Sequence, residues 1–442
     1  MTSSSALTAP PASLSRAARI GVLAVAFLGW FFAGVQMSIT PLVSQSATTD
    51  FLRESPDGVV PRPLLTRWFA RYNATFLFGA AAGGLLFGWV GDRFGRAKAL
   101  ALSICCYSLF SGAAAWAQSP EQFVALRFLG CLGVGGAWPN GIAIAVEVWH
   151  DVSKPVLAGV IGTAANVGLV AMGLVACYAS ITPDSWRWVM LLGAAPVLLG
   201  LASLGLLPES PQWLDARRRT ARDAAIGAGP GSQPPTGSPV SRVFRPPLLW
   251  LTLLGIILGA IPLFGGWGCT NWLVPWADQV GAATDPSLKA WTQVYRSVGA
   301  AASSAAGGWV SARLGRRTSY FLYSLASLFI GQYIYRNLDP THPQFAVWVF
   351  LLGTTTGFYF GWLPLCLPEM FPTEVRSTGS GVTFNSGRIA TGIGVLAAGY
   401  LSSLPYFHGD YGRVGSVTSL VFALGLVAIW FFREQTPPPT TR

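Results

Sequence analysis

Runs of about 20 apolar residues recur along the whole chain and alternate with short polar segments. A helix of that length crosses a hydrocarbon layer ~30 Å thick and satisfies its own backbone polar groups there. We therefore predict an all-α membrane protein with twelve transmembrane helices. The predicted spans are 19–42, 68–91, 97–117, 122–147, 155–180, 186–207, 247–277, 289–311, 318–336, 344–368, 376–402 and 413–433.

One pattern of glycines, aromatic residues and arginines occurs twice. Residues 88–96 read GWVGDRFGR and residues 308–316 read GWVSARLGR, an offset of 308 − 88 = 220 positions, about half the chain. Asn166-x-Gly168 matches Asn385-x-Gly387 at nearly the same offset, and Glu147 matches Glu369. Two pseudo-symmetric six-helix bundles related in this way are the architecture of a transporter whose solute site lies between the halves, near mid-bilayer.

A polar segment at 215–246 divides the spans six and six. It contains an arginine run followed by GAGPGSQPPTGSP, which is the composition of a linker that cannot build its own core. The expected organisation is a disordered cytoplasmic N-terminus (1–17), an N-terminal bundle (18–214), a cytoplasmic linker (215–246), a C-terminal bundle (247–434) and a cytoplasmic tail (435–442).

Composition supports the membrane interpretation. Hydrophobic residues make up 52% of the chain and charged residues only 11%, against roughly 25% charged in average soluble domains. This excludes an ordinary soluble enzyme, a disordered chain and a disulfide-stapled domain. The net charge of +11 comes from Lys and Arg in short segments between the spans, so we expect no nucleic-acid partner. The bias of these residues favours cytoplasmic N- and C-termini in the inner or plasma membrane of the cell.

Catalytic and metal-binding patterns are missing from the sequence. It contains no nucleotide-binding loop, no Ser/His/Asp arrangement and no metal-ligand spacing among its six cysteines. We expect no enzyme, no cofactor and no metal. The expected partners are the lipid bilayer and a small organic solute, with or without a co-transported ion, and the chain is expected to act as a monomer.

Several motifs lie in the turns between the spans. The segment Gly88-x-x-x-Asp92-Arg93-x-Gly95-Arg96-x-Lys98 occupies the tight turn after the second span, where glycine lets the chain reverse. Here the chain resembles the major facilitator superfamily, whose loop motif this segment closely matches. Residues 208–214 (PESPQWL) resemble a motif of its sugar porters and organic-ion transporters, with Gln212 in place of the usual Arg. Residues 127–136 and 368–379 resemble the same branch and the aromatic-acid/proton symporters.

The resemblance implies a gate built from these charges at the inner ends of the two halves. Carboxylates and arginines would pair when the inner ends of the two halves meet. A partly dehydrated network of such pairs can bias a two-state equilibrium by roughly a few kcal/mol. Ala312 occupies the position equivalent to Asp92, so the gate is expected to be asymmetric. The predicted gating residues are Asp92, Arg93, Gly95, Arg96, Glu147, Glu209, Arg313, Arg316, Glu369 and Arg376.

Three arginines fall inside predicted spans. Arg388 lies 388 − 376 = 12 residues beyond Arg376, about 18 Å along a helix and near the bilayer centre. Arg296 is expected in the outer half and Arg127 near the outer mouth. Charges at such depth face the protein interior or a wet cavity, so they are candidates for substrate binding. The alternative for each is a structural arginine bonded to carbonyls. The aromatic-acid branch also carries a Gly-Arg pair in its eleventh span, which Gly387-Arg388 resembles.

Uncharged candidates for substrate binding lie at matching depths. Amide and aromatic side chains suit a small organic solute, although packing against helices or lipid is an equal alternative for each aromatic residue. These candidates are Gln36, Trp138, Asn140, Asn166, Tyr359, Trp362 and Asn385.

The first span bears on the coupling mechanism. It reads Ala33-Gly34-Val35-Gln36-Met37 where the aromatic-acid branch carries acidic residues, so proton symport through such an acid is disfavoured. We predict a secondary transporter of a small organic anion, a carboxylate held by Arg388 and Arg296, that works by alternating access as a uniporter or exchanger. The alternatives are a neutral sugar-like or drug-like solute with structural arginines, and a solute sensor without transport.

Overall fold

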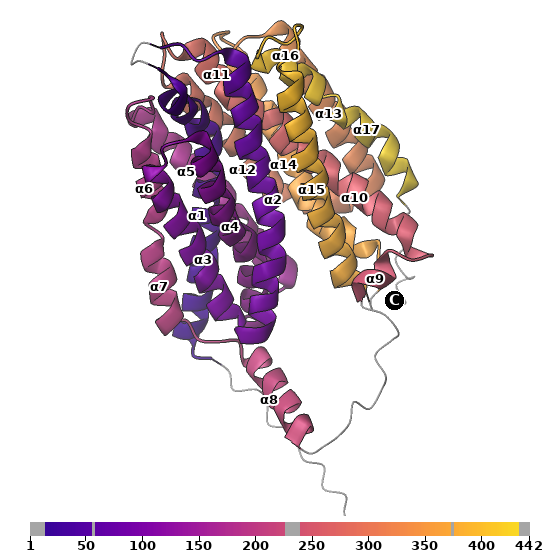
Figure 1. Cartoon of the computed structure of the whole chain (residues 1–442). Helices are drawn as coiled ribbons and strands as arrows, with labels where there is room; N and C mark the ends of the chain where they lie inside the picture. Colours follow the sequence, from indigo (N-terminus) through magenta and orange to yellow (C-terminus); the bar gives the residue numbers. More distant parts are fainter. Residues whose placement is uncertain (1–13, 55–57, 226–238, 373–374, 433–442) are drawn as a thin grey trace, which may run out of the picture.

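The described part of the chain is helical. The computed structural model describes residues 14–54, 58–225, 239–372 and 375–432, and no strand occurs within these ranges (Figure 1). The spans of the N-terminal half are α1 (Arg16–Leu52), α2 (Arg62–Phe94), α3 (Arg96–Ala113), α4 (Pro120–Val148), α5 (Lys154–Tyr178), and α6 (Arg187–Ala194) with α7 (Val197–Leu206).

The C-terminal half repeats this order. Its first span runs through a π turn (Gly265–Cys269) and a 3₁₀ turn (Thr270–Trp272) between two α-helices. The spans are α10 (Leu248–Phe264) with α11 (Leu273–Gly281), α12 (Leu288–Leu314), α13 (Arg316–Asn337), α14 (Phe345–Glu369), α15 (Arg376–Leu401), and α16 (Tyr411–Thr418) with α17 (Val421–Ala428). The prediction of twelve spans is therefore confirmed.

Nine of the spans in the described ranges are apolar enough on their own to cross a membrane. The other three are α12, α13 and α15, which carry arginines, serines and glycines. Helices whose polar side chains face protein need less overall hydropathy than helices surrounded by lipid. Two of these three, α12 and α15, are the helices that the C-terminal half packs against the N-terminal half.

The first helix is longer than predicted. It continues to Leu52, ten residues beyond the expected end at 42, through a polar sequence. Ser46 and Thr48 in this extension are buried and bonded, because Ser46 Oγ donates to the Ile181 carbonyl (3.1 Å) and Thr48 Oγ1 bonds the Tyr72 hydroxyl (3.1 Å). Hydrogen bonds to neighbouring elements thus offset the cost of burying polar side chains.

Equivalent helices pack in equivalent ways in the two halves. The pairs α2–α4, α1–α5 and α3–α7 correspond to α12–α14, α10–α15 and α13–α17. The tight turns also correspond: Gly95 has φ +113° and Gly315, 220 positions later, has φ +86°. Side chains with a Cβ rarely adopt such angles, which explains why glycine stands at both positions. The structure thus consists of two pseudo-symmetric six-helix bundles.

The bundles meet along two equivalent helix pairs. α2 packs against α15 and α12 packs against α5; Figure 1 shows α2 and α15 side by side at the front. Within each bundle, glycines allow the backbones to approach closely. A Cβ on Gly135 would lie 2.1 Å from the Ala80 carbonyl oxygen, and one on Gly353 would lie 2.1 Å from the Arg296 carbonyl oxygen.

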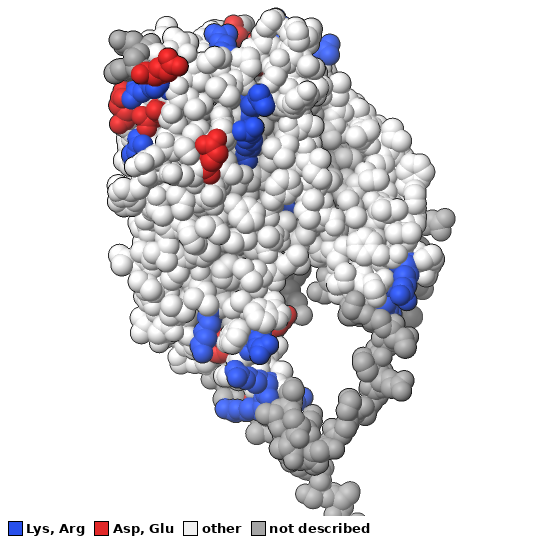
Figure 2. Space-filling model, in the orientation of Figure 1, with Lys and Arg blue, Asp and Glu red and all other residues white. Residues whose placement is uncertain are grey.

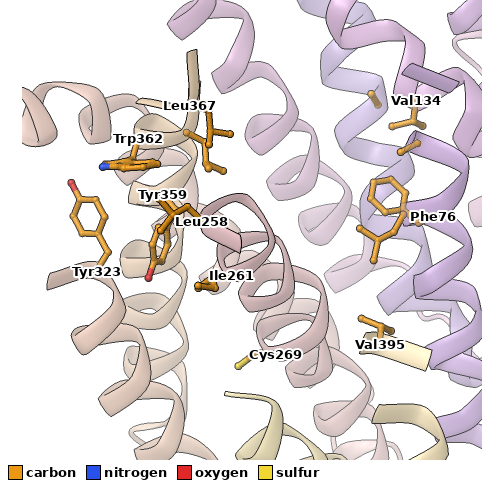
Figure 3. Close-up of a cluster of buried hydrophobic side chains, with 14 of the residues drawn as sticks. Phe76, Val134, Leu258, Ile261, Cys269, Tyr323, Tyr359, Trp362, Leu367 and Val395 are labelled. Atoms are coloured by element: carbon orange, nitrogen blue, oxygen red, sulfur yellow. The ribbon is translucent and has the colours of Figure 1, made fainter. Parts of the chain in front are cut away.

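The positions of the charged residues and of the buried core fit a protein that spans a membrane. Figure 2 shows charged residues gathered towards two opposite ends, with a broad, almost uncharged band between them. Figure 3 shows part of the buried core, in which Tyr323, Tyr359 and Trp362 lie together on the C-terminal half while Phe76 and Val134 belong to the other half. The chain is a multi-pass membrane protein.

Two short helices lie between the halves, α8 (Pro211–Ala225) and α9 (Pro239–Val243). α8 begins inside the predicted N-terminal bundle (18–214) and continues into the predicted linker (215–246). The segment 226–238, residues 1–13 of the expected disordered N-terminus and the expected tail 435–442 lie outside the described residues.

Candidate functional site

The two ends of the molecule differ in how the halves meet. We call the end at which α8 and α9 lie the linker end, and the opposite end the far end. At the far end, polar groups join the halves directly: Thr66 Oγ1 donates to the Gly409 carbonyl (2.8 Å), and Lys289 Nζ donates to the Ile181 carbonyl (2.8 Å). The far end is closed.

The linker end is open. Figure 2 shows an opening between the two bundles at this end, which we call the crevice. The ion pairs that the structure describes here each stay within one half. Arg96 pairs with Glu147 (3.6 Å), and at equivalent positions Arg316 pairs with Glu369 (3.1 Å). The halves are therefore joined at the far end and separated at the linker end.

Arg388 lies on α15 at the contact between the halves. Its Nη1 donates across the interface to the Ala80 carbonyl of α2 (3.3 Å) and to Asn385 Oδ1 (3.4 Å). The guanidinium carbon lies 4.7 Å from the centre of the Phe384 ring. The side chain is only half-buried, and within the described residues its Nε and Nη2 have no recorded hydrogen bond and are not enclosed. One edge of this guanidinium is therefore not engaged by protein groups of the described ranges.

Arg296 lies on α12, nearer the far end, and is held by other side chains. Nη1 donates to Asn271 Oδ1 (3.0 Å) and Nη2 donates to Gln293 Oε1 (2.8 Å). Asn271 in turn donates to Asn73 Oδ1 of α2 (3.1 Å), and Asn73 donates to the Trp267 carbonyl (2.5 Å). The network ties α12, through Asn271, to α2 of the other half.

Arg127 and Gln36 lie together inside the N-terminal bundle. Arg127 is 2% exposed and Gln36 is 1% exposed. Arg127 Nη1 donates to Gln36 Oε1 (3.0 Å), Arg127 Nη2 donates to the Gln36 carbonyl (2.9 Å), and Gln36 Nε2 donates to the Gly193 carbonyl (2.7 Å). These bonds join α1, α4 and α6 and leave little of either side chain accessible.

The three candidate asparagines occupy different environments. Asn140 is buried and donates to the Phe87 (3.0 Å) and Gly136 (2.9 Å) carbonyls, so it joins α2 to α4. Asn166 Nδ2 donates across the halves to Ser304 Oγ of α12 (3.0 Å). Asn385 accepts from Arg388 and donates to the Gly381 carbonyl (3.0 Å). Asn166 and Asn385 therefore lie at the interface between the halves, whereas Asn140 does not.

The aromatic candidates divide in the same way. Tyr359 and Trp362 are fully buried in the C-terminal half, where the Tyr359 hydroxyl bonds Ser324 Oγ (2.7 Å) and Trp362 Nε1 donates to the Arg316 carbonyl (2.9 Å). Trp138 is half-buried, with its ring 5.0 Å from that of Trp30 on α1. The structure thus does not bring Tyr359 and Trp362 together with Arg388.

The predicted gating residues form matched sets at the linker ends. Arg96 also pairs with Asp92. The arginine that precedes each of the two turns stacks on a tryptophan ring. Arg93 lies over the Trp89 ring (5.5 Å) and Arg313 lies over the Trp309 ring (4.0 Å). These two arginines are exposed on the surface.

Glu209 and Arg376 have separate surroundings. Glu209 accepts from the Ala97 amide at the start of α3 (3.1 and 3.2 Å), and its carboxylate fills the space that a Cβ on Gly95 would need. Trp213 Nε1 on α8 donates to the Asp92 carbonyl (2.9 Å), which fixes α8 to the N-terminal half. Arg376 Nε donates to the Phe371 carbonyl (3.3 Å).

The sequence analysis missed several buried polar residues at the far end. Asn73 and Asn271 were not singled out, and Lys289 and Asp278 form a buried ion pair (3.0 Å) that was not predicted. Opposite charges that flank one short loop between two spans were the available signal for the ion pair. No group of three His, Cys, Asp or Glu side chains in the described ranges could hold a metal ion.

Comparison with known proteins agrees with this geometry. The family model of the Major Facilitator Superfamily matches residues 22–284 and 256–442. The cis,cis-muconate transport protein of Acinetobacter baylyi is 25% identical over 82% of this chain and 84% of its own length. The 4-hydroxybenzoate transporter PcaK of Pseudomonas aeruginosa is 26% identical over 86% of this chain and 88% of its own length.

The fold is also that of a solved structure. The partially occluded inward open form of the Escherichia coli xylose transporter XylE superposes with a TM-score of 0.71 at 16% identity, covering 96% of this chain and 100% of that one. The repeated turns, the two bundles and the matched family model lead to one conclusion: the chain belongs to the major facilitator superfamily.

Proposed function

We propose that this protein carries a small organic carboxylate across the membrane by alternating access, and that Arg388 binds the carboxylate. The observation that carries the proposal is the half-buried guanidinium of Arg388 at the interface of the bundles, which has unengaged donors and lies between halves that are joined at the far end and separated at the linker end. Guanidinium groups bind carboxylates through two parallel hydrogen bonds, which are stronger than bonds between neutral groups.

The three membrane arginines differ in their availability. Both terminal nitrogens of Arg127 and of Arg296 already donate to protein acceptors, and the Nε of each is enclosed. Arg388 has only Nη1 engaged within the described residues. We therefore assign carboxylate binding to Arg388, with Asn385 and Asn166 as polar neighbours at the interface. Arg296 would form the closed side of the crevice, and Arg127 would hold its own bundle together.

The curated relatives support the substrate class. Muconate and 4-hydroxybenzoate, which appear in the names of two of them, are both organic carboxylates. The open guanidinium edge of Arg388 gives a physical reason for the same class here. The only buried carboxylate of the described spans, Asp278, already pairs with Lys289 at the far end, which favours uniport or exchange over proton coupling in the crevice.

Charge distribution supports an orientation. Arginines cluster at the linker end, on α8 and in the two matched turns. Cytoplasmic segments of membrane proteins carry an excess of Lys and Arg. The linker end and both termini would therefore be cytoplasmic, the far end would face outward, and the protein would act as a monomer in the inner or plasma membrane of the cell.

Gating would use the matched ion pairs at the linker end. Here Arg96 and Arg316 pair within their own halves. Closing the crevice would bring both pairs close to the opposite half, where their carboxylates could exchange partners. Ion pairs between the halves would then stabilise the state with the linker end closed. Loss of these pairs would favour the state with the linker end open.

The test is counterflow in proteoliposomes loaded with unlabelled compound, using matched acid and amide pairs such as 4-hydroxybenzoate and 4-hydroxybenzamide, together with xylose. We expect labelled acid to accumulate in proteoliposomes loaded with unlabelled acid. We expect no such accumulation in proteoliposomes loaded with the amide. Equal counterflow of acid and amide, or of xylose alone, would contradict carboxylate recognition and favour a neutral solute. Specific binding of the acid without any flux would favour a solute sensor.

A further inference from the structure

Lys289 is a buried cation at the far end. It lies in the first turn of α12 and is 3% exposed, and Asp278 on α11 is 6% exposed. Lys289 Nζ and Asp278 Oδ1 are 3.0 Å apart. Both residues belong to the C-terminal half, so the ion pair by itself would only neutralise two buried charges within one bundle.

The same ammonium also bonds the opposite half. Lys289 Nζ donates to the Ile181 carbonyl (2.8 Å) and to Ser46 Oγ (3.3 Å). Ser46 Oγ itself donates to the Ile181 carbonyl (3.1 Å), so α1 and the segment after α5 form one acceptor site for the cation. A lysine ammonium has three donors and no acceptor. Asp278, Ser46 and Ile181 supply three acceptors, two of them from the N-terminal half.

We propose that Lys289 is a latch that holds the far end closed by placing a charge of one bundle into an acceptor site of the other. Separation of the far ends would break both bonds to the N-terminal half and leave Asp278 as the only remaining protein partner. Charge-assisted hydrogen bonds in a site shielded from water contribute more than neutral ones. The latch therefore stabilises the state in which the crevice opens at the linker end.

The latch has no equivalent in the internal repeat. The position that corresponds to Lys289 in the N-terminal half is 289 − 220 = 69, which is Phe69, a buried aromatic residue. The charged latch at the far end is thus supplied by one half only. Loss of Lys289 is expected to change the balance between the two states of the transporter rather than its affinity for the carboxylate.

The test measures the separation of the far ends directly. Spin labels are attached at Gln118→Cys and Asn337→Cys, both exposed at the far ends of the two halves, in a chain whose six native cysteines are replaced by alanine. Electron–electron double resonance then gives the distance distribution without substrate. Lys289→Met is expected to raise the population with the longer distance by about tenfold, and Ser46→Ala is expected to shift it less, in the same direction.

The double variant Lys289→Met/Asp278→Asn separates a latch from simple charge balance. If Lys289 acts as a latch, the double variant keeps the longer distance, because the bonds to Ser46 and Ile181 are still missing. If Lys289 only neutralises Asp278, the double variant returns to the distribution of the unmodified chain, and the proposal is overturned. Arg413→Met removes an exposed positive charge at the same end, whose bond stays within the C-terminal half, and should change nothing.

The inference rests on the alternating movement that we propose above, but its test does not depend on the substrate. A distance shift with Lys289→Met would support the latch even if the transported solute proved not to be a carboxylate. Unchanged distances in both Lys289 variants would refute the latch and leave the assignment of Arg388 untouched.

Discussion

Replacement of Arg388 by glutamine is the most informative change at the proposed binding site. Glutamine keeps one neutral donor but loses the positive charge and the second parallel hydrogen bond. Hydrogen bonds that involve a charged group contribute about 1.5–3 kcal/mol each. A net loss of about 2–3 kcal/mol corresponds to roughly a 30- to 150-fold weaker apparent affinity for the carboxylate. The bond to the Ala80 carbonyl is lost as well, but it is a single bond of a half-buried side chain.

The assay is counterflow at several concentrations, which separates KM from the maximal rate. We expect KM for the acid to rise by the factor above while the amount of folded, monodisperse protein stays the same. Arg388→Lys keeps the positive charge but loses the paired donors of the guanidinium, so its KM should lie between those of the unmodified protein and Arg388→Gln. Arg413→Gln is the matched control, because Arg413 is exposed at the far end. An unchanged KM in Arg388→Gln would refute the role of this residue in binding.

Two further predictions concern packing inside the bundles. Arg127→Met should lower the thermal stability of the detergent-solubilised protein markedly, because Gln36 would lose a buried partner at a cost of about 1–3 kcal/mol. The KM of the remaining folded protein should not change. An unchanged melting temperature would show that this contact is dispensable. Gly353→Val should abolish the folded peak in size-exclusion chromatography, because its Cβ would lie 2.1 Å from a backbone oxygen of α12. Gly88→Ala is the control, because a Cβ there meets nothing within 4 Å. A normal yield of the valine variant would contradict the close packing of α12 and α14.

The sequence allowed the architecture to be predicted because membrane helices follow simple constraints. Each span must be long and largely apolar, and the repeated turns at Gly95 and Gly315 mark the two halves directly. The helix ends differ from prediction mainly where polar residues are paired. The extension of α1 past 42 is one case, since Ser46 and Thr48 read as a loop until their partners are known.

The surroundings of the charged residues could not be predicted in the same way. Depth along a helix placed Arg127, Arg296 and Arg388 within the membrane, but depth does not say which face of the helix each occupies. Arg127 meets Gln36, which lies 91 positions away in the sequence, and Arg296 meets Asn271 on another span. Such pairs depend on how the helices are rotated and tilted against one another, which hydropathy does not record.

The central claim is that the two bundles tilt about the crevice, so that one end closes as the other opens. Spin labels at Lys98→Cys and Thr318→Cys, exposed equivalents at the linker ends of α3 and α13, report on one end, and the pair at positions 118 and 337 reports on the other. Distances from both pairs should be measured with and without a transported carboxylate. The account predicts reciprocal changes: populations in which the linker-end distance shortens are those in which the far-end distance lengthens. Distances that stay fixed at both ends, or that lengthen and shorten together, would contradict it.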